Sequence, residues 1–232
     1  MTQPTMIAFD ADDTLWQNET LYHHAQDVFV DLLRHYHSED WIRARLFDTE
    51  MRNMAHFGYG IKAFVLSMIE TSVQLTEGRI TGAEIGVLID QARAMIDAEI
   101  ELLPGVLEVL QQLHGRYPLA LITKGDLLDQ HRKVQRSGLG DLFQHIEVVA
   151  DKNDATYAGL ISKFGVPAAG FMMVGNSLKS DILPVLRLGG QAVYIAHALT
   201  WAHESAPTPE PGTPGYFELP TISGLPQVLA KL

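Results

Sequence analysis

The apolar residues of this chain follow two patterns. Short apolar runs occur at residues 6–9, 119–122, 171–174 and 192–195, and at residues 146–149, where Glu147 interrupts the run. Continuous rather than alternating runs are typical of strands buried on both faces, as in a parallel sheet. The stretches between the later runs have the length and composition of covering helices, at residues 106–113, 127–136 and 155–164. This alternation of strand and helix predicts a doubly wound α/β domain with a Rossmann-like parallel sheet.

A long helical stretch separates the first predicted strand from the second. Apolar residues recur at helical spacing from residue 19 to residue 36, and further helices are predicted from Ser38 and at 61–74. Thr81 and Glu84 have the spacing of a capping box before a fourth helix. We therefore predict an α/β core of residues 1–15 and 101–232, interrupted by a helical domain of residues 16–100.

The end of the chain has a different texture. Residues 207–215 are rich in proline and glycine, which excludes a helix or a central strand and predicts an extended surface connection. Residues 216–219 are a predicted edge strand, and residues 225–232 are a predicted closing helix. The loop Gly58-Tyr59-Gly60 resembles a dinucleotide fingerprint, but it follows no strand, so we interpret it as a link between helices.

Polar residues follow four of the predicted strands. Asp10, Asp12, Asp13 and Thr14 follow the first strand; Thr123, Lys124 and Gly125 follow the second; Lys152 follows the third; Asn176 and Asp181 follow the fourth. The carboxyl ends of parallel strands meet at one edge of a sheet, so these groups are expected to converge. Crowded carboxylates repel one another unless a cation or a proton offsets their charge. Asp13 or Thr14 could instead cap the following helix.

Composition limits the classes of function. Of the 232 residues, 47% are hydrophobic, which suffices for a large core. The net charge of -11 argues against unspecific binding to nucleic acid or to an anionic membrane. The absence of cysteine excludes disulfides and thiolate metal sites, and no run approaches a membrane-spanning length. We therefore expect a cytoplasmic protein that acts on a small molecule, and no protein partner is indicated.

The ordered set of polar residues resembles the haloacid dehalogenase superfamily, and in particular its phosphatase branch. That branch has Asp-x-Asp-x-Thr after the first strand, then Ser or Thr, then Lys, then an acidic motif; here these positions hold Asp10, Asp12, Thr123, Lys152 and Asp181. The helical stretch resembles the cap domain inserted at the same place in the superfamily. The resemblance implies that Asp10 attacks phosphorus, that Asp12 is general acid and base, and that Lys152 neutralises charge.

The same resemblance implies a phosphate site and a metal site. Thr123 and the backbone near Lys124 and Gly125 would bind phosphate oxygens. Mg²⁺ would be held by Asp10, Asp12, Asp181 and Asn176, the ligand from Asp12 being its carbonyl group. The chain departs from the phosphatase pattern at Asn176, where an acid is usual, so that the site carries less negative charge.

The expected function is a magnesium-dependent phosphatase of a small phosphorylated metabolite, with an aspartyl-phosphate intermediate. Two alternatives stay open. The first is a metal-independent 2-haloacid dehalogenase, because those enzymes carry Asn near position 176, although they have Tyr where this chain has Asp12. The second is a non-catalytic phospho-acceptor switch resembling response-regulator receivers, which are shorter and lack the helical insertion.

Overall fold

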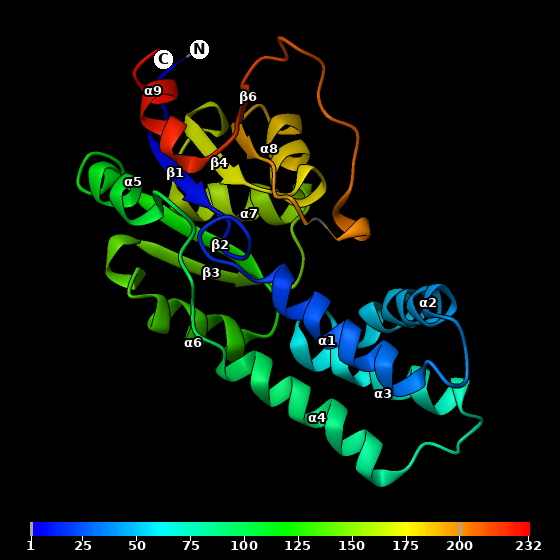
Figure 1. Cartoon of the computed structure of the whole chain (residues 1–232). Coiled ribbons are helices and arrows are strands. Elements are labelled where there is room, and N and C mark those ends of the chain that lie inside the picture. Colours follow the sequence, from blue (N-terminus) through cyan, green and yellow to red (C-terminus); the bar gives the residue numbers. More distant parts are fainter. Residues whose placement is uncertain (1, 200) are drawn as a thin grey trace. The chain divides into compact units, whose positions relative to one another are not determined.

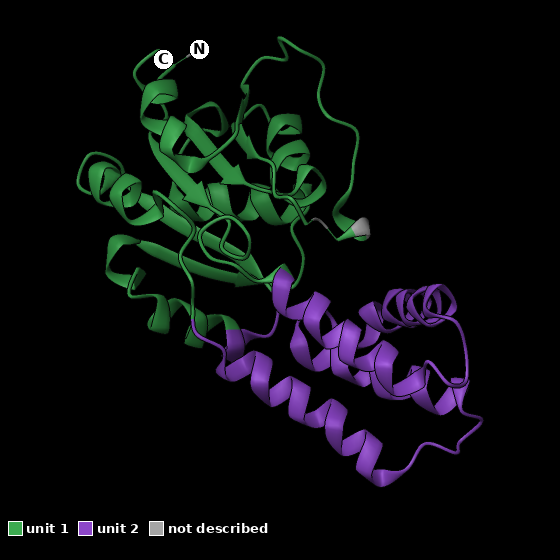
Figure 2. Ribbon diagram, in the orientation of Figure 1, with its two compact units in different colours: residues 1–19, 100–124, 130–232 green, residues 20–99, 125–129 purple. Residues whose placement is uncertain are grey.

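The computed structural model describes residues 2–199 and 201–232, and it divides into two compact units (Figures 1 and 2). An α/β unit comprises residues 1–19, 100–124 and 130–232, and a helical unit comprises residues 20–99 and 125–129. The short segment 125–129, which the sequence analysis assigned to the α/β core, groups with the helices. Within the helical unit, Lys62 Nζ lies 2.9 Å from a carboxylate oxygen of Asp126, which belongs to this segment.

The α/β unit is built on one parallel sheet of six strands, which confirms the predicted fold class. The strands are β1 (Met6–Phe9), β2 (Leu119–Lys124), β3 (His145–Val149), β4 (Phe171–Gly175), β5 (Gln191–Ile195) and β6 (Tyr216–Leu219). Their order is β3-β2-β1-β4-β5-β6, and every pair is parallel. β6 is an edge strand, as predicted. β1 lies between β2 and β4, so the chain leaves its first strand at the point where the strand order reverses.

Helices cover both faces of this sheet (Figure 1). They are α5 (Val106–Leu113), α6 (Leu127–Ser137), α7 (Asp154–Phe164), α8 (Leu183–Arg187) and α9 (Leu225–Leu229), with short turns η1 (Gly140–Leu142), η2 (Ala168–Gly170), η3 (Leu178–Ile182), η4 (Ala202–Glu204) and η5 (Ile222–Gly224). The predicted closing helix is shorter than expected and ends at Leu229. The proline-rich residues 207–215 contain no helix or strand, as predicted.

The residues of β1 explain why both faces must be covered. Ile7 and Phe9 pack on one face with side chains of α5 and α9, whereas Met6 and Ala8 pack on the other face with α7 and α8. All four residues are buried. Full burial of a large apolar side chain contributes roughly 1.5–3 kcal/mol. The central strand is therefore anchored from both sides just before it delivers the acidic residues at its end.

The helical unit has a core of its own. It consists of α1 (Glu19–Leu33), α2 (Glu39–Phe57), α3 (Ile61–Leu75) and α4 (Gly82–Asp97), with the five residues 125–129. Each helix contributes buried apolar side chains to this core, for example Phe29 of α1, Leu46 of α2, Met68 of α3 and Leu88 of α4. The predicted capping box is present, since the Thr81 and Glu84 side chains each accept a backbone N–H of the other residue.

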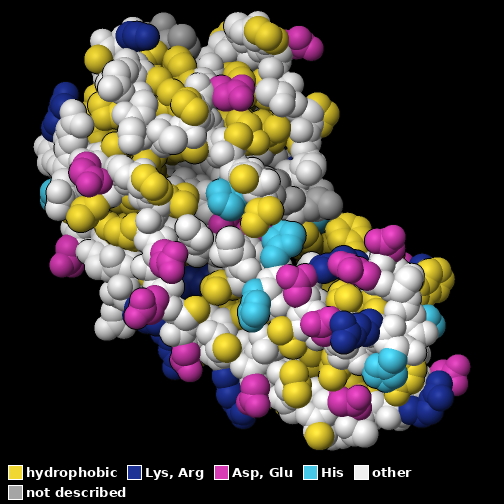
Figure 3. Space-filling view, in the orientation of Figure 1, with side chains coloured by type: hydrophobic (Ala, Val, Ile, Leu, Met, Phe, Trp, Pro, Cys, Tyr) yellow, Lys and Arg dark blue, Asp and Glu magenta, His cyan; other side chains and the backbone are white. Residues whose placement is uncertain are grey.

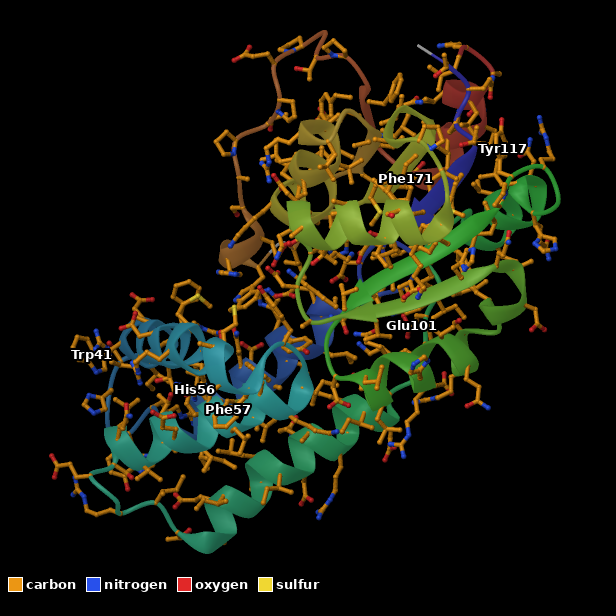
Figure 4. All side chains as sticks on the ribbon, turned by 180° about the vertical axis from the view of Figure 1, so that it is seen from behind. Trp41, His56, Phe57, Glu101, Tyr117 and Phe171 are labelled. Carbon is orange, nitrogen blue, oxygen red and sulfur yellow. The ribbon has the colours of Figure 1, made fainter. Side chains whose placement is uncertain are left out.

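The end of α1 and the link between α2 and α3 can be compared with the sequence predictions. The first helix ends at Leu33 rather than near residue 36. Residues 58–60 link α2 to α3, as predicted, and Gly58 and Gly60 have φ values of 70° and 111°, which favour glycine. Figure 4 shows Trp41, His56 and Phe57 on this unit; Trp41 and Phe57 are half exposed.

The surface is mixed in character. Figure 3 shows acidic, hydrophobic and histidine side chains interspersed on one face. Within the described residues, no helix is both long enough and apolar enough to span a bilayer.

Candidate active site

The site is built at the carboxyl ends of β1, β2 and β4, with Lys152 from the loop after β3. Asp10 follows β1 directly, Thr123 is the penultimate residue of β2, and Asn176 follows β4 directly. Parallel pairing of β1 with both neighbours puts these strand ends at one edge. Four of the predicted residues, Asp10, Lys152, Asn176 and Asp181, are linked there by hydrogen bonds, in part through Thr14.

Asp10 is buried and has two partners. Its Oδ1 accepts a hydrogen bond from Lys152 Nζ, and its Oδ2 accepts one from Thr14 Oγ1 at 2.9 Å. Burial raises the pKa of Asp10; the ammonium of Lys152 opposes this effect, and the neighbouring charge of Asp181 adds to it. The Asp10 carboxylate is therefore held in a fixed orientation in a setting that disfavours a second negative charge.

Lys152 joins Asp10 to Asp181. Its ammonium donates to Asp181 Oδ1 at 2.8 Å, and the side chain is almost completely buried. Burial tends to lower the pKa of Lys152, but the charges of Asp10 and Asp181 outweigh it and raise the pKa. The buried hydroxyl of Tyr157 also faces Asp181 Oδ1, at 3.5 Å. One ammonium thus serves two buried carboxylates, which leaves the cluster with an excess of negative charge.

The π-helical turn η3 places Asp181. Asp181 Oδ2 accepts the backbone N–H of Ser177 at 3.0 Å, which folds the side chain back toward the end of β4. A Cβ at Gly175 would lie 2.3 Å from the same oxygen, so only glycine leaves room for this carboxylate. π-helical turns recur at functional sites, and here the turn delivers a buried acid to Lys152.

Asn176 contacts the cluster through a hydroxyl. Thr14 Oγ1 lies 3.2 Å from Asn176 Oδ1 and 2.9 Å from Asp10 Oδ2. A hydroxyl has one proton and can donate to only one of these oxygens at a time. Asp10 Oδ2 and Asn176 Oδ1 therefore share one donor, the Thr14 hydroxyl, and the oxygen that does not receive its proton can accept another partner.

The carboxylate of Asp12 takes a different set of partners from that of Asp10. Trp16 Nε1 donates to its Oδ1 at 2.7 Å, and Gln130 Nε2 donates to its Oδ2 at 2.9 Å. Lys133 Nζ contacts both oxygens, at 3.1 and 3.2 Å. The sequence analysis did not identify Gln130 or Lys133. Their only signal was a spacing of three on the helix that follows Thr123, which equally fits a solvated face.

Asp13 has the capping role that was considered from the sequence. Its carboxylate accepts the backbone N–H groups of Asn18 and Glu19 at 2.9 and 3.1 Å, where α1 begins. Burial raises the pKa of Glu19 to about 7, and the charges of Asp13 and Asp12 act in the same direction. The N-terminus of α1 therefore carries two further acidic groups, Asp13 and Glu19.

Lys124 makes contacts that the sequence did not predict. Its ammonium donates to Ser180 Oγ at 2.8 Å and to a carboxylate oxygen of Glu204 at 2.5 Å. Glu204, from η4 in the connection between β5 and β6, also accepts hydrogen bonds from Ser177 Oγ and Ser180 Oγ, at 2.6 and 2.5 Å. Burial tends to raise the pKa of Glu204, but Lys124 and the hydroxyl groups outweigh it and lower the pKa to about 2.

The remaining predicted residues are Thr123 and Gly125. Thr123 is buried at the end of β2. Gly125 follows Lys124 directly, has a φ of 142° and belongs to the helical unit. Their role in binding phosphate stays a prediction.

The described residues contain no group of three His, Cys, Asp or Glu side chains suited to a metal ion. A cation at this edge of the sheet would therefore need amide or backbone oxygens beside a carboxylate. The oxygens of Asp10 and Asn176 that share the Thr14 hydroxyl are such a pair, and they are hard donors of the kind that Mg²⁺ prefers.

Known proteins similar to this chain carry hydrolase names. Pyrimidine 5'-nucleotidase YjjG of Escherichia coli is 26% identical over 215 residues, covering 87% of this chain and 91% of that protein. The structure of a haloacid dehalogenase-like family hydrolase from Xanthomonas campestris is 39% identical, covers 99% of this chain and 91% of that chain, and superposes with a TM-score of 0.88.

A more distant likeness shows the fold alone. A 2-haloacid dehalogenase from Pseudomonas syringae is 19% identical and covers 98% of this chain and 99% of that chain, with a TM-score of 0.65.

The model of the haloacid dehalogenase-like hydrolase family matches residues 4–189, which include every residue of the cluster around Asp10. Because the family model covers most of the chain and the 39% identical structure spans 99% of it, the chain belongs to the haloacid dehalogenase-like hydrolases.

Proposed function

We propose that the protein is a magnesium-dependent phosphatase that acts on a small phosphorylated metabolite through an aspartyl-phosphate intermediate. The observation that carries this proposal is the pair of carboxylates after β1. Asp10 is fixed by Lys152 and Thr14, and Asp12 is fixed by its own donors two residues later. Two carboxylates in different surroundings suit two roles, a nucleophile and an acid–base group.

In the first half-reaction, an oxygen of Asp10 forms a bond to phosphorus while the bond between phosphorus and the ester oxygen breaks. The departing oxygen takes a proton from the carboxyl group of Asp12. Lys152 supplies positive charge beside the attacking carboxylate, which lowers the repulsion between that carboxylate and the phosphate.

In the second half-reaction, water forms a bond to phosphorus and the bond between phosphorus and Asp10 breaks. The proton of the attacking water passes to Asp12, which restores the proton that Asp12 gave up earlier. The products are inorganic phosphate and the free Asp10 carboxylate, so one carboxyl group serves as acid and then as base.

The residues present fit a magnesium ion. Asp10 and Asn176 would contribute side-chain oxygens, and Asp12 would contribute its backbone carbonyl. Asp181 would complete the set, and its oxygens already accept N–H donors from Lys152 and Ser177. When bound, Mg²⁺ would supply positive charge next to the phosphate oxygens.

The proposed substrate class is small. The helical unit is inserted directly after the Asp10 motif, as a cap domain would be, and a cap favours metabolites over macromolecules. The relative in Escherichia coli is named a pyrimidine nucleotidase, so nucleoside monophosphates belong in the first substrate panel beside sugar phosphates.

The test is release of inorganic phosphate from p-nitrophenyl phosphate and from the metabolite panel, with Mg²⁺ and with excess chelator. We expect turnover that chelation abolishes, and no turnover by the folded variant Asp10→Asn. Undiminished turnover by that variant would contradict the proposal.

The same samples test the dehalogenase alternative, which Asn176 favours. Free halide is measured after incubation with 2-chloropropionate in the presence of chelator. Halide release without phosphatase activity would favour carbon–halogen cleavage, with Asp10 as the nucleophile, over the proposed function.

A further inference from the structure

Lys133 on α6 is a buried cation outside the cluster around Asp10. Only 6% of its surface is exposed. Its ammonium contacts both carboxylate oxygens of Asp12, at 3.1 and 3.2 Å, and Asn18 Oδ1 at 2.7 Å. Burying an ammonium is unfavourable unless its partners compensate, so the arrangement needs close and well-directed acceptors.

The surroundings of Asp12 are organised around its carboxylate. Each group that contacts its two oxygens is a donor, namely the indole of Trp16, the amide of Gln130 and the ammonium of Lys133. Gln130 turns its amide nitrogen to Asp12 and leaves its own Oε1 buried without a partner. A buried acceptor without a partner destabilises the fold, so this orientation of the amide is explained by the additional donor that it gives to Asp12.

We propose that Lys133 is a positioning residue for Asp12. This inference rests on the proposed function, in which Asp12 takes a proton from the attacking water. The ammonium contacts both carboxylate oxygens at once, so it fixes the rotation of the carboxylate as well as its place, and its bond to Asn18 ties it to the start of α1. Lys133 itself touches neither phosphorus nor the leaving group.

Lys133 is expected to affect the reaction rate by keeping the Asp12 carboxylate in place. A displacement of about 1 Å in a reacting group costs on the order of 100-fold in rate. Replacing Lys133 by methionine keeps the length of the side chain and removes the donors. We expect Lys133→Met to lower kcat about 10- to 100-fold with a small change in KM, because substrate binding does not involve Asp12 rotation.

Two comparisons separate positioning from a structural role. Lys133→Arg keeps a cationic donor and should recover most of the lost kcat. In the Asp12→Asn background, Lys133→Met should change the residual rate by less than about twofold, because the group through which it acts is already gone. Lys163→Met, at an exposed ion pair with Glu147, is the matched control and should leave kcat unchanged.

A readout without turnover keeps this inference distinct from the proposed function. The indole N–H of Trp16 donates to Asp12, so its NMR resonance reports the position of that carboxylate. We expect Lys133→Met to shift the Trp16 indole resonance and to leave that of Trp41 in place. Should Lys133→Met not fold, Lys133→Gln, which keeps a neutral donor, allows the same comparison.

The inference is overturned by an unchanged kcat, by an equal loss in the Asp12→Asn background, or by an unmoved Trp16 resonance in folded Lys133→Met. If the wild-type protein releases no phosphate, the proposed function fails, and the Trp16 resonance still decides whether Lys133 positions Asp12.

Discussion

Buried charge at a few residues explains the construction of the site. Asp10 and Asp181 share the ammonium of Lys152, and Asp12 has that of Lys133. The order of Asp10, Lys152 and Asp181 along the chain was enough to predict that these three would meet, because each follows a predicted strand of one parallel sheet. The strand before Lys152, β3, lies at the edge of the sheet, and its residues are only partly buried. The partner of Asp12 could not be predicted in this way, since Lys133 lies inside a helix.

Gly175 offers a test at the residue scale. A Cβ at this position would lie 2.3 Å from Asp181 Oδ2 and 2.6 Å from its Cβ, so the acid must move and lose its contact with Lys152. We expect Gly175→Ala to lower the free energy of unfolding by about 1–3 kcal/mol and to reduce phosphatase turnover.

Gly159→Ala in α7 is the matched control, because a Cβ there meets nothing within 4 Å. It should raise stability by about 0.5–1 kcal/mol, as alanine does in a helix interior. Urea denaturation of the two variants measures both effects, and a Gly175→Ala protein as stable as the wild type would show that the Asp181 placement is not constrained by this glycine.

Among the helices and strands, the apolar pattern predicted best those elements whose residues are nearly all buried. The residues of β1, β2 and β4 are almost all buried, and these strands were predicted from apolar runs alone. α6 follows the opposite rule: its polar residues Gln130 and Lys133 are buried, while Leu127 and Leu128 are exposed. A pattern that assumes apolar residues inside cannot identify such a helix as part of a site.

The turn η4 gives a prediction at the same scale. Glu204 anchors the connection between β5 and β6 to Lys124, Ser177 and Ser180. Its pKa is lowered to about 2 from an ordinary value of 4.5, so its stabilisation is complete above pH 4.5 and is lost as the pH falls toward 2.

We therefore expect Glu204→Gln to reduce the free energy of unfolding near pH 7 by on the order of 3 kcal/mol, with a difference from wild type that shrinks between about pH 5 and pH 2. Urea titrations across this range measure the difference. Glu108→Gln, on the exposed side of α5, is the control. A difference for Glu204→Gln that stays constant with pH would contradict the ion pair with Lys124.

At the scale of the whole molecule, one long insertion divides the chain into an α/β unit and a helical unit. The change from strand-like runs to helical periodicity indicated this division. The inclusion of residues 125–129 in the helical unit was not predictable, because the segment meets the helices through residues far apart in the sequence, such as Lys62 and Asp126, which are 64 positions apart.

In the proposed reaction, phosphorus becomes bonded to Asp10 and is then released to water. The most direct measurement is mass spectrometry of protein quenched in acid shortly after mixing with p-nitrophenyl phosphate and Mg²⁺. We expect one added phosphoryl group on the peptide that contains Asp10, sensitive to hydroxylamine and absent from Asp10→Asn. Turnover with no phosphoryl group on that peptide, or an equal signal in Asp10→Asn, would contradict it.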